Sequence, residues 1–223
     1  MTCFVGIDVG VSGALAAIDA ETKEVSFWDT PTVTVKSGKS FKNQLDVHAG
    51  TAILRDIRNS CAGELLVTIE KVNAMPSIGG PDGPRAMGVT SAFNFGMGFG
   101  MWIGICAALE LPYQLVHPAT WKARLMADMG KEKDASRVRA MQLYPYTAKD
   151  LARKKDHARG DALLLAHFGL CGGAVQKPTK PATVAPAHGN WAPAPSLFGE
   201  IHGAKTTSRT KRVEIEDDPL GPF

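Results

Sequence analysis

The sequence has little of what would place it among small disulfide-stapled, zinc-binding or strongly charged proteins. Its four cysteines lie far apart without a CxxC pair, which argues against a zinc ribbon or a disulfide framework and favours a reducing compartment. The formal net charge is only +3, so the overall balance does not by itself indicate a nucleic-acid partner. With 44% hydrophobic and 21% charged residues among 223, the chain is expected to fold around one sizeable core.

The N-terminal region also lacks targeting features. Residues 1–20 have no basic leader and no small-residue cleavage site, and Asp8 interrupts their apolar run. We therefore expect no signal peptide and a cytoplasmic protein, in the bacterial host cell if the chain is phage-encoded.

One long segment is free of charge. Residues 89–109 carry glycines at four-residue spacing, a pattern also found in packed transmembrane helices. Polar residues near its start and the absence of a basic flank favour a buried helix instead. A membrane or scaffold protein built on this segment is the minority alternative, and we expect no membrane partner.

The order of apolar runs and turn formers predicts the fold class. Strands are expected at 4–8, 14–18, 25–28, 64–70 and 113–116, and helices at 45–57, 89–109, 120–126, 133–143 and 160–168. Residues 71–88 are rich in glycine and proline and predict a long, functional loop. The pattern indicates an α/β fold with a mixed five-stranded sheet covered by helices on both faces.

The composition changes after Cys171. Residues 177–195 are rich in proline and alanine, which favours a flexible segment. We expect a folded domain at 1–171 and a linker with a C-terminal tail at 172–223. Residues 211–215 allow an edge strand or docking segment, although a solvated end is the favoured interpretation.

Two acidic residues end apolar strands. Asp8 lies within Gly-Ile-Asp-Val-Gly at 6–10, and Glu70 follows the apolar run at 65–69. A buried carboxylate is costly unless a positive partner meets it. Either residue alone is more simply a strand end at the water boundary, but the pair favours a metal ion.

Asp161 is the third candidate metal ligand, at the start of the apolar helix expected at 160–168. Taken alone it is more simply a residue that favours the helix N-terminus. Three carboxylates from two strands and a helix nevertheless match a paired-magnesium centre for phosphodiester chemistry. A fourth ligand is open between His157, four residues earlier and on the same helical face, and Asp156, which otherwise caps the helix; His157 is ranked slightly ahead.

Positive charge is concentrated before Asp161. Residues 117–159 hold eleven lysines and arginines against five acidic residues, an excess twice that of the whole chain. A basic stretch that leads to metal ligands suits a phosphate-backbone substrate, although a solvated helical face has the same composition.

In these motifs the sequence resembles the RuvC-type Holliday-junction resolvases of the ribonuclease H-like superfamily, in particular phage and prophage forms. The resemblance covers roughly residues 3–170. It rests on segments 6–10, 69–76, 88–96, 118–122 and 155–162, together with Gly100 and Gly104.

The resemblance implies a ribonuclease H-like three-layer fold and a homodimeric endonuclease. Such an enzyme nicks opposing strands of branched DNA, leaves 5′-phosphate and 3′-hydroxyl ends, and uses two Mg²⁺ ions per site, which Mn²⁺ can replace. Asp8, Glu70 and Asp161 would bind the ions, and Lys122 would lie near the scissile phosphate. No nucleotide cofactor is expected. The expected DNA contacts are Lys71, Asn73, Asn94, Lys122, Arg124, Lys131, Lys133, Arg137, Lys154, Lys155 and Arg159.

The sequence departs from the family pattern in a few places. Ala158 stands where cellular resolvases carry their fourth ligand, three residues before the last aspartate, and Asn73 stands where an aromatic wedge can occur. The segment between Met75-Pro76 and Gly88 is longer than in close relatives, and the tail after Cys171 has no counterpart.

Two alternatives remain at this point. A nuclease of phage DNA packaging or debranching would cut branched DNA with little preference. An actin-like or sugar-kinase-like ATPase shares a Gly-Ile-Asp-x-Gly phosphate loop, but it needs two such domains and a second loop, which the sequence does not show.

Overall fold

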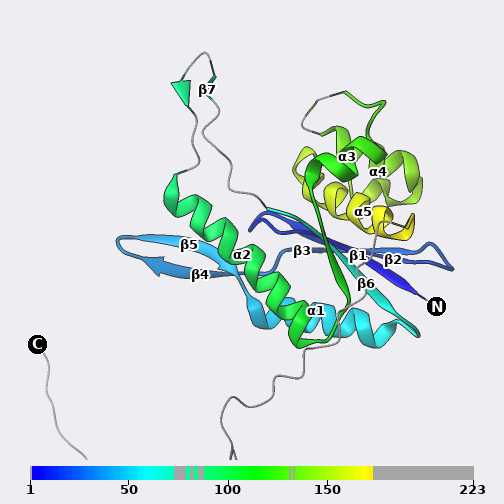
Figure 1. The fold of residues 1–223 in the computed structure, drawn as a ribbon, viewed down its shortest axis with the longest axis horizontal. Helices are drawn as coiled ribbons and strands as arrows, with labels where there is room; N and C mark the ends of the chain where they lie inside the picture. The colour runs from blue at the N-terminus through cyan, green and yellow to red at the C-terminus, as the bar shows by residue number, and fades with distance from the viewer. Residues whose placement is uncertain are drawn as a thin grey trace, which may run out of the picture. The chain divides into compact units, whose positions relative to one another are not determined.

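The computed structural model describes residues 2–72, 79–80, 83–84, 88–130, 132 and 134–172. Its centre is a five-stranded mixed sheet of order β3-β2-β1-β6-β9, shown in Figure 1. The strands are β1 (Cys3–Asp8), β2 (Ala14–Asp19), β3 (Val25–Asp29), β6 (Leu65–Glu70) and β9 (Tyr113–Val116). β1 pairs antiparallel with β2 and parallel with β6, and β6 pairs parallel with β9.

Helices cover both faces of this sheet. One face carries α1 (Val47–Ser60) and α2 (Val89–Ala108). The other carries α5 (His157–Leu170), with α3 (Pro118–Leu125) and α4 (Ala135–Leu143) beside it. Short 3₁₀ turns, η1 (Pro145–Lys149) and η2 (Lys154–Asp156), connect α4 to α5. The expected α/β fold, a mixed five-stranded sheet with helices on both faces, is confirmed.

Each face of the sheet has its own apolar core. Alternate side chains of β1, such as Val5 and Ile7, pack with Leu54 of α1 and Trp102 of α2. The opposite core joins residues of β2 to the apolar face of α5. The alternation of strand side chains therefore distributes the apolar residues between two layers, as the sequence pattern requires.

The contact between β1 and α5 depends on a glycine. A Cβ atom added at Gly6 would lie 2.0 Å from the carbonyl oxygen of Ala162 and 2.4 Å from the backbone nitrogen of Ala166. Any side chain at Gly6 would therefore push the helix away from the strand. Because Asp8 is two residues from Gly6 and Asp161 adjoins Ala162, this contact also sets how closely the two acidic residues approach.

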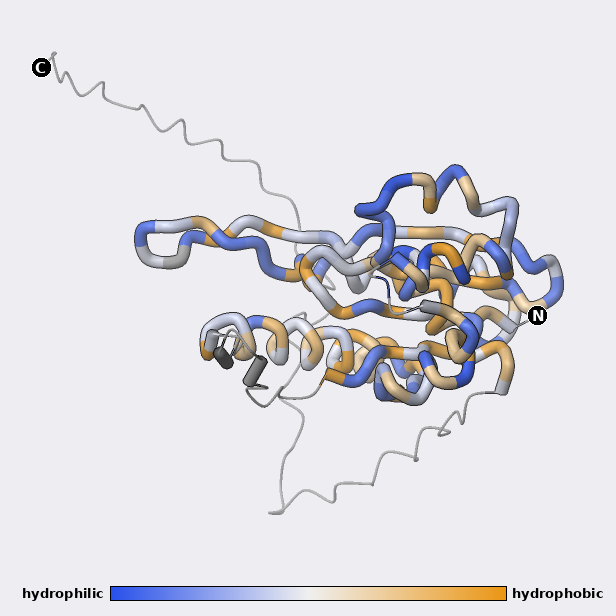
Figure 2. Tube along the Cα trace, turned by 90° about the horizontal axis from the view of Figure 1, so that it is seen from above, coloured by the Kyte–Doolittle hydropathy of each residue, from blue (hydrophilic) through white to orange (hydrophobic). Residues whose placement is uncertain are grey.

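The structure adds a β-hairpin that the sequence pattern did not reveal to us. β4 (Thr32–Ser37) and β5 (Ser40–Leu45) pair antiparallel in a separate two-stranded sheet. The hairpin extends beyond the central sheet on the side of α2 (Figures 1 and 2). The following helix starts at Val47 instead of residue 45, because Asp46 caps it by accepting a hydrogen bond from the Ala49 N–H at 3.0 Å.

α2 is the one described helix long and apolar enough, by length and composition, to cross a membrane, and 17% of its most apolar window is buried. Figure 2 shows apolar and neutral residues along most of it. A single helix of this kind is weak evidence for a membrane span, because core helices of soluble proteins pass the same test. Its exposed apolar surface is nevertheless a feature that a function has to explain.

Two parts of the organisation expected from the sequence, the C-terminal tail and the long loop, are not fully covered by the described residues. The tail from 173 to 223 and most of the long loop at 71–88 lie outside the described residues. Within that loop the structure describes residues 71, 72 and 88 and two short paired segments, β7 (Gly79–Gly80) and β8 (Gly83–Pro84). The proposed division at residue 171 stays a prediction.

Candidate active site

Asp8 and Glu70 are the last residues of two neighbouring parallel strands. Ile7 of β1 pairs with Ile69 of β6, and one residue later each strand ends in its carboxylate. Because the strands run in the same direction, both acidic side chains lie at the same edge of the sheet. The sequence therefore brings these two groups together through ordinary strand register.

Asp161 joins them from α5. It is the fifth residue of that helix, which packs along β1 and β6. The negative charge of Asp161 acts on the ionisation of both Asp8 and Glu70, so the three acidic groups share one electrostatic environment. The three residues singled out from the sequence thus converge in the structure.

Burial dominates the ionisation of this cluster. Burial, followed by the charges of Asp161 and Glu70, raises the pKa of Asp8 to about 7, against the lowering effects of the Gly10 N–H and Lys122. Burial also raises the pKa of Glu70 and of Asp161. A nearby cation would lower these raised pKa values, because a positive charge favours the ionised form of each carboxyl group.

Each carboxylate has a protein partner. The buried indole Nε1 of Trp121 donates to Oε1 of Glu70 at 3.0 Å. A side-chain hydrogen bond from the buried Ser136 lowers the pKa of Asp161. Oδ1 of Asp8 accepts a hydrogen bond from the Gly10 N–H at 3.4 Å. Sequence analysis assigned no role to Trp121 or Ser136, although the position of Trp121 just after a strand beside β6 was a signal that could have been used.

Lys122, which the sequence analysis singled out, is a positive charge that acts on the acidic cluster. Its charge lowers the pKa of all three acidic groups, and its Nζ lies 5.0 Å from the centre of the Trp121 ring. The side chain is exposed, so it combines access to solvent with influence on the buried carboxylates. Trp121 and Lys122 therefore serve the same site from the start of α3.

The two candidates for a fourth ligand have different surroundings. Both oxygens of the buried Asp156 accept hydrogen bonds from Arg153, through the backbone N–H and the guanidinium, at 2.8–3.1 Å. Arg153 accordingly lowers the pKa of Asp156. His157, the first residue of α5, acts electrostatically on Asp161. The contacts favour His157, and its ligand role stays a prediction.

Among the described residues, no three His, Cys, Asp or Glu side chains are arranged to hold one ion between them. The carboxylates turn to separate donors, as mutual repulsion of adjacent negative groups requires. The buried Oδ1 of Asp161 nevertheless has no hydrogen-bond partner among the residues that the structure describes, an arrangement that normally calls for a ligand or ion. Hard carboxylate oxygens are the donors that Mg²⁺ and Mn²⁺ prefer, so the residues present fit a divalent cation once these side chains turn toward it.

The expected DNA contacts divide into two groups. Arg159 pairs with Asp29 through Nε and Nη2 at 2.7 and 2.8 Å, and Arg137 donates to the Leu151 carbonyl oxygen and to Asp134. Arg124 donates to the carbonyl oxygen of Cys171. These three guanidinium groups therefore make hydrogen bonds to other groups of the same chain.

The other expected contacts are placed differently. Lys122, Lys154 and Lys155 are exposed, while Lys71, next to Glu70, and Asn94 in α2 are half-buried. Asn73, Lys131 and Lys133 lie outside the described residues. Exposure makes these lysines accessible but does not show that they contact DNA, so the DNA-facing surface stays a prediction.

Comparison with solved structures finds 23 similar chains, two of which are described here. RuvC of Thermus thermophilus in complex with Holliday junction substrate has 13% identity and a TM-score of 0.47, over 78% of this chain and 98% of that chain. A second Thermus thermophilus RuvC structure has 16% identity and a TM-score of 0.41, over 76% of this chain and 96% of that chain. No protein-family model matches the chain, and no curated protein matches it.

Proposed function

We propose that the chain is a divalent-metal-dependent endonuclease that hydrolyses phosphodiester bonds in branched DNA, with the four-way junction as its main substrate. The products would be 5′-phosphate and 3′-hydroxyl ends. The observation that carries the proposal is the convergence of Asp8, Glu70 and Asp161 at one sheet edge, with burial raising the pKa of each. Structural ion pairs do not explain such a cluster, because its charges have the same sign.

The side chains around the cluster have separable roles. Trp121 and Ser136 orient Glu70 and Asp161 by hydrogen bonds. Lys122 offsets negative charge that develops on the reacting phosphate, and His157 is the proposed fourth ligand. Two Mg²⁺ or Mn²⁺ ions would, when bound, lower the pKa of the attacking water and stabilise the leaving oxygen. Asp8, Glu70 and Asp161 are half-buried, which limits the screening of these charges by solvent.

The exposed surface of α2 supports a homodimer as part of the proposal. Val89 and Phe93 are 88% and 70% exposed, and α2 carries no charged residue that would favour contact with water. Two copies would supply the two active sites that opposing nicks in a four-way junction require. Sedimentation of the wild-type chain and of Phe93→Glu tests this point. We expect the wild type to be a dimer and Phe93→Glu to be a monomer. A monomeric wild type would contradict the proposed homodimer.

Cleavage of a synthetic four-way junction tests the activity. With Mg²⁺ we expect paired nicks from wild type, a loss of about a thousandfold in rate for Asp8→Asn and Glu70→Gln, and full activity for Asp56→Asn, which changes an exposed carboxylate on α1. Calorimetric titration with Mn²⁺ gives a second readout, with binding to wild type and Asp56→Asn only. Undiminished cutting by either active-site variant contradicts the proposal.

The same assay distinguishes the remaining alternatives. A broad branched-DNA nuclease would cut flaps and Y-forks as fast as junctions, whereas we expect junctions to be cut faster. An ATPase would be stabilised against heat by ATP, and we expect no such shift. We also propose a cytoplasmic location, which cell fractionation checks by recovery in the soluble fraction.

A further inference from the structure

A groove lies beside the proposed active site, between the β4–β5 hairpin and the N-terminal half of α2. Its volume is about 560 Å³. One wall consists of Val9, Gly10 and Val11, the residues that directly follow Asp8 in the chain. The groove therefore begins within two residues of a proposed metal ligand, on the opposite side of β1 from the α5 packing contact.

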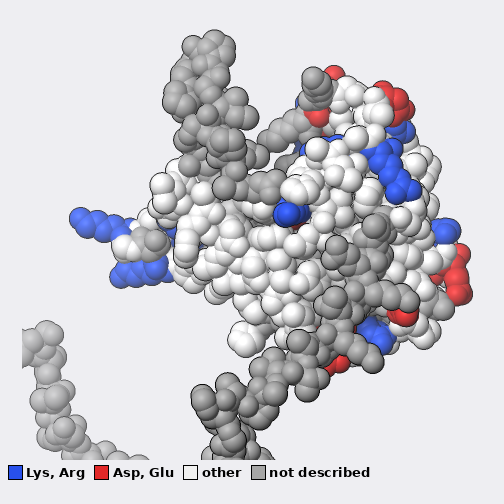
Figure 3. All heavy atoms as spheres, in the orientation of Figure 1, with Lys and Arg blue, Asp and Glu red and all other residues white. Residues whose placement is uncertain are grey.

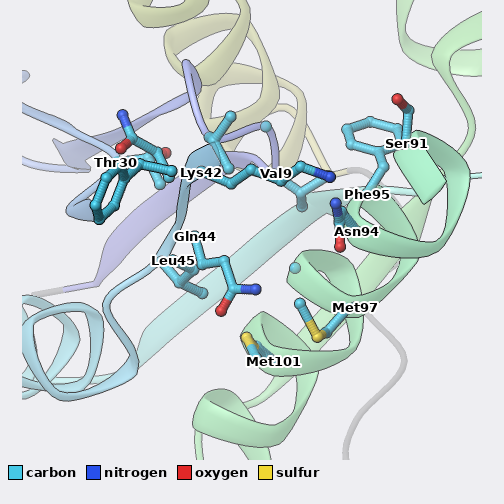
Figure 4. A pocket seen from close by; sticks show the side chains of 15 residues that line it. Val9, Thr30, Lys42, Gln44, Leu45, Ser91, Asn94, Phe95, Met97 and Met101 are labelled. Atoms are coloured by element: carbon cyan, nitrogen blue, oxygen red, sulfur yellow. The ribbon is translucent and has the colours of Figure 1, made fainter. Parts of the chain in front are cut away.

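The lining combines polar groups with flat and flexible apolar surface. Figure 4 shows Lys42 and Gln44 of β5 and Asn94, Met97 and Met101 of α2 around one space. Lys42, Gln44 and Asn94 are half-buried, and none of the three side chains makes an ion pair or a hydrogen bond within the described part of the chain. Polar groups left in this condition favour a ligand that supplies negative charge and hydrogen-bonding edges.

The hairpin is positively charged along its length. It contains Lys36, Lys39 and Lys42 and no aspartate or glutamate between residues 32 and 45. None of these lysines pairs with an acidic group in the described residues. Figure 3 shows lysine atoms at the projecting end of the hairpin, with no acidic atoms beside them on this face. Such a surface complements a polyanion.

The size and chemistry of the groove select among polyanions. A volume of this order holds a ligand of one or two nucleotides, not the full width of a duplex. Phe95 from α2 lines it, and aromatic side chains stack on bases of unpaired strands. Amide groups such as those of Gln44 and Asn94 can pair with exposed base edges.

We propose that this groove binds an unpaired strand of the DNA substrate next to the cleaved phosphate. Lys36, Lys39 and Lys42 neutralise its phosphates, Phe95 stacks on a base, and Gln44 and Asn94 contact the base edge. The proposal rests on the proposed function, because it assigns the substrate feature that the same site reads. It explains why a lysine-bearing hairpin is placed beside the proposed metal ligands.

Binding in EDTA tests this without any cleavage. The probe is a fluorescein-labelled single-stranded oligonucleotide, with a labelled duplex of equal length as comparison, titrated with the full chain over a range of salt concentrations. For the triple variant Lys36→Ala, Lys39→Ala, Lys42→Ala we expect single-strand affinity to fall by at least about tenfold and the slope of log K against log [salt] to become shallower by about 2. The matched control is Lys23→Ala, Arg55→Ala, Lys149→Ala, which removes the same charge from exposed positions away from the groove.

Base contact has its own readout. An oligonucleotide with 2-aminopurine should be quenched by wild type, and Phe95→Leu should reduce this quenching while leaving phosphate binding and its salt slope unchanged. Equal single-strand affinity for the triple variant and its control overturns the proposal, as does equal loss of duplex and single-strand binding. Because these measurements need no metal or turnover, a chain that binds as expected but does not cut would refute only the nuclease activity.

Discussion

The two faces of the central sheet are built in opposite ways. On the α5 face, backbone meets backbone: Gly6 and Gly160 allow α5 to touch β1 and α4 so closely that an added Cβ would lie 2.0 Å and 2.7 Å from the nearest atoms. On the other face, Gly96, Gly100 and Gly104 of α2 look onto open space. The closed face fixes the acidic groups, and the open face leaves a groove and an apolar helix for other molecules.

The largest effect is expected when one glycine on each face is replaced by alanine. Gly6→Ala should reduce the free energy of unfolding by about 3 kcal/mol or more, because neither backbone can move without repacking. Gly100→Ala should increase it by about 0.5–1 kcal/mol, because alanine favours helix and its methyl group meets no atom of the described residues within 4 Å. Urea denaturation measures both, and equal effects would remove the distinction between the faces.

The pH dependence of stability tests the acidic cluster of the closed face. Because burial and neighbouring charges raise the pKa of Asp8 to about 7, the folded protein holds a proton that the unfolded chain releases near pH 4. The stabilisation is complete at low pH and is lost as pH rises toward about 7. At pH 8 without metal, Asp8→Asn should therefore stabilise the protein by about 3–4 kcal/mol.

Thermal unfolding at several pH values in EDTA measures this effect. Asp19→Asn is the control of opposite sign, because hydrogen bonds from the Thr22 and Glu21 N–H groups lower the pKa of the half-buried Asp19. Its carboxylate therefore favours folding at high pH and loses that effect on acidification. If Asp8→Asn were less stable than the wild type at pH 8, repulsion among the carboxylates would not destabilise the folded protein, and this prediction would be wrong.

Two tryptophans are fully buried in the described part of the chain, and they permit a matched comparison with a smaller expected effect. Trp121 donates to Glu70, whereas Nε1 of Trp102, in the core that α1 and α2 form with the sheet, has no partner among the described residues. Trp121→Phe should cost about 1–2 kcal/mol more than Trp102→Phe, because it removes a hydrogen bond to a carboxylate. It should also slow junction cleavage by about tenfold with restored activity at higher Mn²⁺, while Trp102→Phe leaves the rate unchanged.

The smallest effect concerns paired and unpaired surface charge. Arg159→Gln removes an exposed bidentate pair with Asp29 and should cost about 0.5–1 kcal/mol. Lys36→Gln, on the hairpin, should leave the free energy of unfolding unchanged. A double-mutant cycle with Asp29→Asn assigns the first loss to the pair, and a coupling near zero would contradict that assignment.

The sequence predicted the sheet strands and the acidic positions because both follow short-range rules. Short apolar runs bounded by turn formers identified β1 and β6, and their ends placed Asp8 and Glu70 at one edge once the strands were known to be parallel. The hydrogen-bond partners of the carboxylates were harder to predict from the sequence, because the Trp121–Glu70 hydrogen bond joins residues 51 positions apart. Such contacts depend on the register of neighbouring elements and leave no local pattern.

The hairpin was missed for a different reason. Residues 32–45 alternate between polar and apolar types, but the polar residues include three lysines and both faces are largely exposed. Without a buried face, alternation in this segment resembles that of a loop. The same lack of burial makes it suitable for contact with a ligand.

The hairpin also leaves and rejoins the body of the protein at nearly the same point. The Asp46 N–H donates to the carbonyl oxygen of Pro31 at 2.9 Å, and Thr32 pairs with Leu45. A segment with adjoining ends is an exchangeable module: it can be shortened to a tight turn, or replaced by a hairpin of different charge, without moving β3 or α1. Chimeras made at this junction would change the charge of the hairpin while keeping the central sheet and its acidic cluster, and would thereby test whether the hairpin affects the choice of substrate.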